Sequence, residues 1–147
     1  MIQTSLNLLW NLEGDPMTKT LTQSVAFKNC SPQQLYGIYM DSKKHAAAIG
    51  SKAFVQNKVG GNFSAFGMLK GKILALVKGK MIVQTWRSIK FRKNDEDSIL
   101  VLRFEQIKGG ARINLVHAFI PDHDYGDIKK GWPNYYWKPW RKYLLKS

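Results

Sequence analysis

Cysteine is nearly absent from this chain of 147 residues. The single cysteine, Cys30, excludes a disulfide within the chain, and such a composition is typical of proteins from reducing compartments. The sequence also lacks any apolar run near the ~20 residues that a membrane-spanning helix requires. Together these two absences predict a cytoplasmic protein without a membrane span.

Acidic residues are scarce as well. There are 10 Asp and Glu against 23 Lys and Arg, which gives a formal net charge of +13. Such a field attracts phosphates, anionic lipids or an acidic protein partner. The basic residues are scattered, whereas a nucleic-acid-binding surface needs a dense basic stripe with exposed aromatic rings beside it. We therefore do not expect nucleic acid as the partner.

The motifs of familiar chemistry are missing. The histidines His45, His117 and His123 lack the spacing of metal ligands, and no cysteine pair supports them, so we predict no metal site. The sequence contains no P-loop, no G-x-S-x-G elbow and no dinucleotide-binding fingerprint. No nucleophile stands beside an evident base. We predict no cofactor and assign no catalytic residue.

Residues 1–16 differ from the rest because they contain no Lys or Arg. A second methionine, Met17, then opens a regular pattern. We interpret residues 1–16 as an N-terminal extension or a cloning remnant. The length of the remainder predicts that residues 17–147 form a single domain.

Alternating apolar and polar residues predict a first strand over 20–29. Ser31, Pro32 and Gln34 then form a capping-box pattern for a short helix. Asp41 is the expected cap of a second helix, which ends at Gly50. The following pattern is typical of hairpins, with short turns between six strands expected at 53–58, 62–67, 72–78, 80–91, 98–108 and 111–120. The order of elements predicts an antiparallel sheet of seven strands closed by a long helix.

The final helix has the most distinctive pattern. Its large apolar residues recur every four positions, which places them on one face: Ile128, Trp132, Tyr136, Trp140 and Leu144. We expect this helix to start after residues 121–124, with Asp124 as a cap, and to bend at one or both of Pro133 and Pro139. The aromatic face either packs as an ordinary core helix or forms the roof of a cavity over a curved sheet.

Five sequence pieces occur in order along nearly the whole of the expected domain: Gly60-Gly61-x-Phe63, Ile82-Val83-Gln84-Thr85-Trp86-Arg87, Gly109-Gly110, Val116-His117-x-x-x-Pro121 and Gly131-Trp132-x-x-Tyr135-Tyr136-Trp137-x-Pro139-Trp140. This set resembles the small single-domain relatives of the activator of the heat-shock protein 90 ATPase, which belong to the SRPBCC, START-like or helix-grip superfamily. The resemblance implies an α+β fold: a curved, seven-stranded antiparallel sheet, two short helices after the first strand, and a long C-terminal helix over the concave face. It also implies a cavity between sheet and helix, often for an apolar ligand, and more weakly contact with a chaperone.

Among the polar residues, His117 stands out because it lies in an apolar row of a predicted strand. Its face holds Ala111, Ile113, Leu115 and Phe119. Two interpretations remain open: a core histidine hydrogen-bonded to a backbone group or a tyrosine hydroxyl, or a cavity residue that orients a ligand.

Two further polar residues have simpler interpretations. Arg87 either clamps a carboxylate at the cavity mouth or pairs with an acid at Asp95–Asp97 or Glu105. His45 lies beside two lysines, so we expect it to be solvated or to act as a cap.

The leading functional hypothesis is a module that binds a hydrophobic or amphipathic small molecule. The residues expected to contact it are Phe66, Trp86, Leu102, Phe104, His117, Trp132 and Tyr136. The alternative is a protein-interaction role as a chaperone-associated partner, suited to the basic surface. A third hypothesis, a cavity enzyme of the cyclase type, would need a second polar group near His117, which the sequence does not supply.

Overall fold

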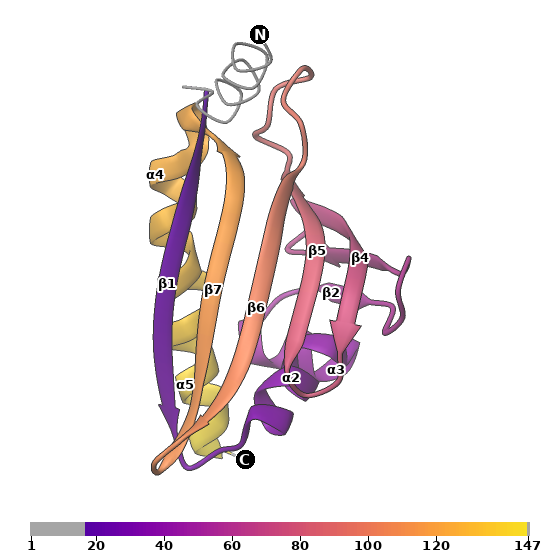
Figure 1. Ribbon diagram of the computed structural model, residues 1–147. Coiled ribbons are helices and arrows are strands. Elements are labelled where there is room, and N and C mark those ends of the chain that lie inside the picture. The colour runs from indigo at the N-terminus through magenta and orange to yellow at the C-terminus, as the bar shows by residue number, and fades with distance from the viewer. Residues whose placement is uncertain (1–16, 147) are drawn as a thin grey trace, which may run out of the picture.

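The computed structural model describes residues 17–146, so the expectation for residues 1–16 lies outside the described part. Seven strands form one antiparallel sheet in the order β1-β7-β6-β5-β4-β3-β2 (Figure 1). Their bounds are β1 Thr18–Lys28, β2 Ala53–Val55, β3 Asn62–Ala65, β4 Leu69–Val77, β5 Met81–Ser88, β6 Ser98–Ile107 and β7 Gly110–Pro121. The predicted α+β fold is thereby confirmed, although the edge strand β2 and its neighbour β3 are shorter than expected.

Two short helices follow β1, as predicted. Helix α2 (Pro32–Met40) begins at the expected capping box, in which the Ser31 hydroxyl accepts from the Gln34 amide and the Gln34 side chain accepts from the Ser31 amide. Helix α3 (Ser42–Ile49) is capped by the Asp41 side chain and ends at Gly50, whose φ of 67° is the left-handed conformation that glycine adopts without strain. Helix α3 packs against β2 and the C-terminal helix, so the pair closes one end of the sheet.

The C-terminal helix consists of three consecutive parts: α4 (Asp122–Gly131), a π-helical segment η1 (Trp132–Trp137) and α5 (Lys138–Lys146). It starts at Asp122, and no side chain caps it, so the expectation that Asp124 caps this helix is wrong. The expected distortion takes the form of the π segment, which begins beside Pro133. A proline has no amide hydrogen and crowds the preceding turn, which favours a wider turn here.

The π segment changes which aromatic residues are buried. Four residues of the predicted stripe, Ile128, Trp132, Tyr136 and Trp140, are buried as expected. Trp137 is buried as well, because a π-turn aligns residues five apart. The rings of Trp132 and Trp137 consequently stack with centroids 5.4 Å apart and planes at 18°.

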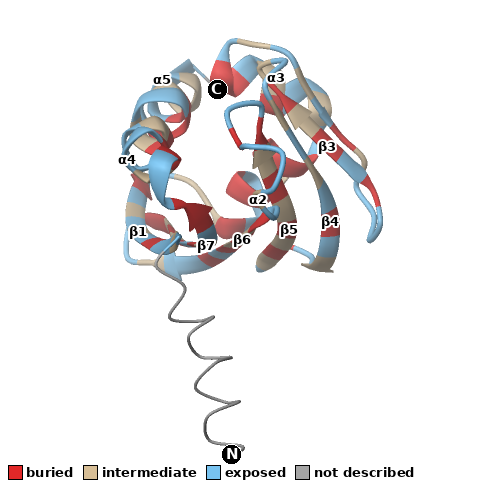
Figure 2. Cartoon of the chain, turned by 90° about the horizontal axis from the view of Figure 1, so that it is seen from above, coloured by how far each residue is buried: buried red, intermediate tan, exposed pale blue. Residues whose placement is uncertain are grey.

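Seen from above, the sheet curves around the C-terminal helix, and the buried residues of both face inward (Figure 2). The inward-facing row predicted along β7 is buried as far as His117, and beyond it the buried and exposed positions exchange. Phe119 has a φ of 60° and is 53% exposed, whereas Ile120 is fully buried. The prediction that Phe119 faces inward is therefore wrong, because an irregularity in the pairing of β1 with β7 shifts the alternation by one residue.

Candidate functional site

An apolar pocket of about 210 Å³ lies between the sheet and the C-terminal helix. One wall comes from the β3–β4 turn and the ends of β4 and β5, and the other comes from α4 and η1. Its apolar lining is Phe66, Met68, Leu69, Trp86, Ile128, Trp132, Tyr135 and Tyr136, and its polar lining is Ser88, Lys90, Asp124 and Asp127. The curved sheet and the aromatic face of the C-terminal helix, both expected from the sequence, therefore leave open space between them at one end.

The structure brings four of the seven expected contact residues to this pocket: Phe66, Trp86, Trp132 and Tyr136. The other three do not line it. Leu102 is fully buried within the sheet, and Phe104 packs edge-on against Tyr36 of α2, with ring centroids 5.7 Å apart. His117 lies behind the pocket wall, with its ring 4.7 Å from that of Trp86.

His117 is 0% exposed and connects the pocket wall to the sheet. The Ser98 hydroxyl donates to the Trp86 carbonyl at 2.6 Å, so it can only accept from His117 Nε2 at 2.8 Å. The other ring nitrogen, Nδ1, then accepts from the Trp132 indole N–H at 3.2 Å. This arrangement requires a neutral imidazole, and burial lowers the pKa of His117 to about 3.

His45 forms the second buried connection. The prediction of a solvated or capping residue is wrong, because His45 is 0% exposed. Its Nδ1 lies 2.7 Å from the Tyr39 carbonyl, which can only accept, so Nδ1 carries the hydrogen. Nε2 then accepts from the Tyr136 hydroxyl at 2.9 Å. Burial lowers the pKa of His45 to about 4 and raises that of Tyr136, so both groups are neutral.

These two histidines fix the orientation of the aromatic roof. Trp132 and Tyr136 lie one helical turn apart and line the same pocket. The Trp132 indole N–H and the Tyr136 hydroxyl each donate a hydrogen bond to a buried histidine. Their rings also contact each other, with centroids 4.8 Å apart. Neither ring can rotate without breaking a buried hydrogen bond, so the pocket wall is preorganised.

Phe66 forms the opposite lip of the pocket. Its φ of 60° is uncommon for an aromatic residue, and its amide donates to the Lys52 carbonyl at 2.9 Å. Its ring contacts Tyr135 and Tyr136 edge-on, with centroid distances of 5.7 and 6.0 Å. A strained backbone held in place by surrounding contacts is characteristic of positions that shape a site.

The polar groups gather at the mouth of the pocket. The Lys90 ammonium pairs with the Asp127 carboxylate at 3.5 Å, and both side chains are exposed. Asp124 is only 4% exposed, and burial raises its pKa. From the sequence we expected Asp124 to cap the helix. However, Asp124 lies four residues before Ile128 and therefore continues the buried stripe of residues 128, 132, 136 and 140.

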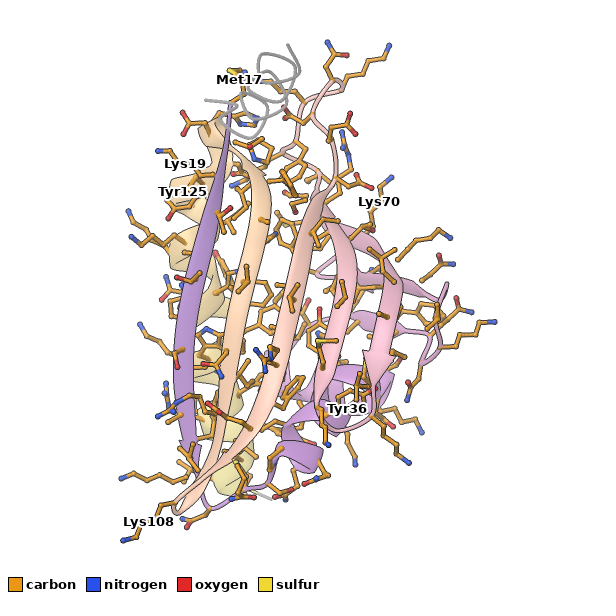
Figure 3. The ribbon with its side chains drawn as sticks, in the orientation of Figure 1. Met17, Lys19, Tyr36, Lys70, Lys108 and Tyr125 are labelled. Carbon is orange, nitrogen blue, oxygen red and sulfur yellow. The ribbon has the colours of Figure 1, made fainter. Side chains whose placement is uncertain are left out.

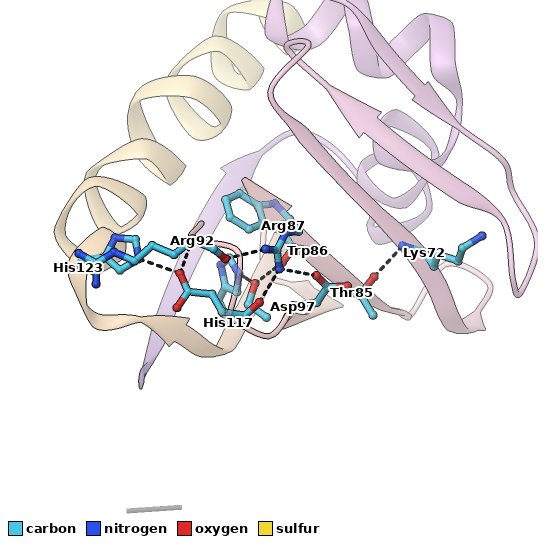
Figure 4. Close-up of polar contacts among 10 residues, drawn as sticks. Lys72, Thr85, Trp86, Arg87, Arg92, Asp97, His117 and His123 are labelled. Atoms are coloured by element: carbon cyan, nitrogen blue, oxygen red, sulfur yellow. Dashed lines mark hydrogen bonds and ion pairs between the residues drawn. The ribbon is translucent and has the colours of Figure 1, made fainter. Parts of the chain in front are cut away.

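Arg87 lies outside the pocket and pairs with one acid, Asp97, which agrees with one of its two interpretations. Its guanidinium contacts the Asp97 carboxylate at 3.1 Å and donates to the Asp95 and Arg92 carbonyls (Figure 4). His123 reaches the same loop through the Asp95 carboxylate at 2.9 Å. These contacts order residues 92–97, beside the end of β5.

The basic side chains are dispersed over the surface. Lys70 and Lys108, for example, project outward at opposite ends of the sheet (Figure 3). Within residues 17–146, no three His, Cys, Asp or Glu side chains gather as a metal site. No helix in that range has the length and apolar character to cross a membrane.

Comparison with known proteins identifies the family. The sequence model described as "Activator of Hsp90 ATPase homolog 1-like protein" matches residues 29–144. The chain is 30% identical over 118 residues to the activator of 90 kDa heat shock protein ATPase homolog of Dictyostelium discoideum. That match covers 80% of this chain but 30% of the relative, so the chain spans less than a third of that protein's length.

Solved structures share the helix-grip fold. An HSP90 activator from Plasmodium falciparum superposes with a TM-score of 0.74 and 25% identity, covering 87% of this chain and 96% of that one. A protein from Mesorhizobium loti gives a TM-score of 0.74 at 20% identity, covering 88% and 98% of the two chains. These likenesses extend over nearly all of the described residues.

Proposed function

The chain belongs to the family of proteins like the activator of Hsp90 ATPase homolog 1, and from that premise we propose that it binds a small hydrophobic or amphipathic molecule. The observation that carries this proposal is the preorganised apolar pocket between sheet and helix. Its walls include Phe66, Trp86, Trp132 and Tyr136. Rigid aromatic walls lower the ordering cost of binding, because little motion remains to be lost when a ligand enters.

The pocket volume limits the ligand to a compact apolar group. An apolar cavity of about 150 Å³ binds benzene, and this pocket holds about 210 Å³. One or two fused rings, or a branched aliphatic group of similar volume, would fill it. A longer molecule would leave its remaining part at the mouth, beside Lys90 and Asp127.

The experiment is to fill the pocket by mutation. Leu69→Trp replaces an aliphatic side chain of the pocket lining, at the start of β4, by a bulky indole ring. Leu74→Trp makes the same change on that strand at a site that is 46% exposed. Binding of 2-methylnaphthalene, followed by tryptophan fluorescence and by amide NMR shifts, should be lost in Leu69→Trp and kept in Leu74→Trp. Equal binding by both variants, or no binding by the unaltered protein, would refute the proposal.

A second function, contact with an acidic chaperone partner, is favoured by two observations. The chain carries a net charge of +13, and its superposition on the solved HSP90 activator from Plasmodium falciparum covers 96% of that chain at 25% identity. We propose that it associates with an Hsp90-type chaperone in the cytoplasm. A pull-down with purified Hsp90 should retain the chain at about 50 mM salt and release it at about 500 mM, because salt screens exposed charges. Retention that is independent of salt, or no association, would contradict this proposal.

For catalysis of the cyclase type, neither buried histidine is placed to act as a base. His45 and His117 lie outside the pocket lining, and both ring nitrogens of each are engaged in hydrogen bonds. Their lowered pKa values are also far from the neutral range in which a general base is most effective. We therefore propose no catalytic role for either histidine.

A further inference from the structure

Asp124 has an unusual position for a carboxylate. It lies in the first turns of α4, lines the pocket, and is 4% exposed. Across residues 17–146 its side chain makes no hydrogen bond and no ion pair within 4 Å, whereas the acids around it, Asp95, Asp122 and Asp127, are all paired. The carboxylate oxygens of Asp124 are not fully enclosed by protein, so they open onto the pocket that Asp124 lines. A carboxylate that is largely removed from water and has no partner in the protein can be satisfied by a donor that enters the pocket.

The Lys90 ammonium at the pocket mouth opposes the rise in the pKa of Asp124 through its charge, but it forms no ion pair with that carboxylate. Lys90 is directed to Asp127, on the same helix as Asp124 but on its exposed side, with an N–O distance of 3.5 Å. The Ser88 hydroxyl, which also lines the pocket, accepts from the Lys90 amide at 3.1 Å. Within the described lining, the Asp124 carboxylate is thus an acceptor without a donor, and the Trp86 indole N–H is a donor without an acceptor.

We propose that the pocket selects ligands with an apolar ring system and a hydrogen-bond donor, an amine or a hydroxyl, which Asp124 accepts at the pocket mouth. This inference rests on the proposed small-molecule function and specifies its ligand class. An ionised carboxylate only accepts hydrogen bonds, and bonds to it are the stronger, charge-assisted kind.

The same geometry disfavours an acidic ligand such as a fatty acid. A ligand carboxylate at the mouth would lie near Asp124 and Asp127, and like charges brought together in a partly desolvated site repel. The overall charge of +13 acts in the opposite direction and attracts anions. Ligand preference therefore distinguishes local recognition by Asp124 from the general field of the protein.

The test uses four naphthalene probes that share one ring system: 1-methylnaphthalene, 1-naphthalenemethanol, 1-naphthylmethylamine and 1-naphthoate. Their affinities are measured by titration calorimetry for the unaltered protein, for Asp124→Asn and for the control Asp122→Asn, whose side chain pairs with Lys19 outside the pocket lining. We expect the amine to bind at least about tenfold tighter than the methyl compound, which is the discrimination of one charge-assisted hydrogen bond. We expect naphthoate to bind most weakly.

Asp124→Asn should abolish this preference, so that the amine and the methyl compound bind with similar affinity. Asp122→Asn, on the same helix but outside the pocket lining, should shift all four affinities by less than about threefold. Equal binding of all four probes by the unaltered protein, or tightest binding of naphthoate, would overturn the inference while leaving the small-molecule function intact. Absence of binding for every probe would instead overturn the proposed function. The ranking on the unaltered protein decides the matter even if Asp124→Asn fails to fold.

Discussion

Acid should unfold this protein through its two buried histidines. His45 and His117 are neutral in the folded state, with pKa values of about 4 and about 3 against an ordinary value of 6.5. The unfolded chain therefore binds more protons than the folded one as the pH falls below 6.5. The stabilisation is therefore complete above about pH 6.5 and decreases as the pH falls toward the pKa values of the folded state.

The size of the effect can be worked out from these values. At about pH 5 an unfolded histidine is mostly protonated, and each of the two buried ones remains neutral. Each costs about 1.4 kcal/mol for every pH unit below 6.5, so the loss at pH 5 is about 2 kcal/mol per histidine and about 4 kcal/mol for the pair. Most carboxylates titrate at lower pH. Asp124, whose pKa is raised by burial, contributes with the opposite sign.

Urea unfolding at about pH 7.5, 6.5, 5.8 and 5.0 measures this dependence, with circular dichroism as the probe. The glutamine amide reproduces one donor and one acceptor, so His45→Gln and His117→Gln should each remove about half of the pH slope, and the double variant nearly all of it. The slope is the readout, since the absolute stability of each variant will also change. A free energy of unfolding that is constant between pH 7.5 and 5 would refute the assigned protonation states.

Two further pairs of substitutions test the packing. Tyr136→Phe leaves His45 Nε2 as a buried acceptor without a donor, so it should lower the free energy of unfolding in urea by about 2 kcal/mol. Tyr135→Phe, at a residue that is 61% exposed, should lower it by less than about 0.5 kcal/mol. Equal losses would contradict the assigned hydrogen bond. Gly71→Ala should prevent folding, because the new Cβ would lie 1.9 Å from the Thr85 carbonyl oxygen, whereas Gly37→Ala, with open space around it in α2, should stabilise by up to about 1 kcal/mol in thermal unfolding.

Local sequence rules predicted the fold well where a short segment determines its own structure. The capping box at Ser31 and the left-handed glycine at Gly50 each satisfy backbone groups within a few residues, so their patterns are legible without tertiary information. The same rules gave the wrong side for Phe119. The inversion in β7 depends on how β1 pairs with it, which is a long-range property that no alternation pattern within β7 contains.

The candidate site was only partly predictable, for a similar reason. The aromatic positions Trp86, Trp132 and Tyr136 follow from periodicity, and they do line the pocket. His45 was misplaced because its neighbours in sequence, two lysines, suggest solvent, whereas its partners Tyr39 and Tyr136 come from other elements. Burial of a polar residue depends on finding partners, and partners distant in sequence leave no local signal.

The π segment links these observations. A continuous α-helix would place Trp137 about 100° from Tyr136 and turn its ring away from Trp132. The extra residue in the turn at Pro133 instead stacks Trp137 beneath Trp132, and the Trp137 indole donates to the Gln23 side chain of β1 at 2.9 Å. Trp132 is thus held from one side by His117 and from the other by Trp137, so the wide turn provides the rigid roof that the pocket requires. π-turns carry a cost and occur frequently at functional sites. In this chain the wide turn orders the aromatic rings of the pocket wall before any ligand binds.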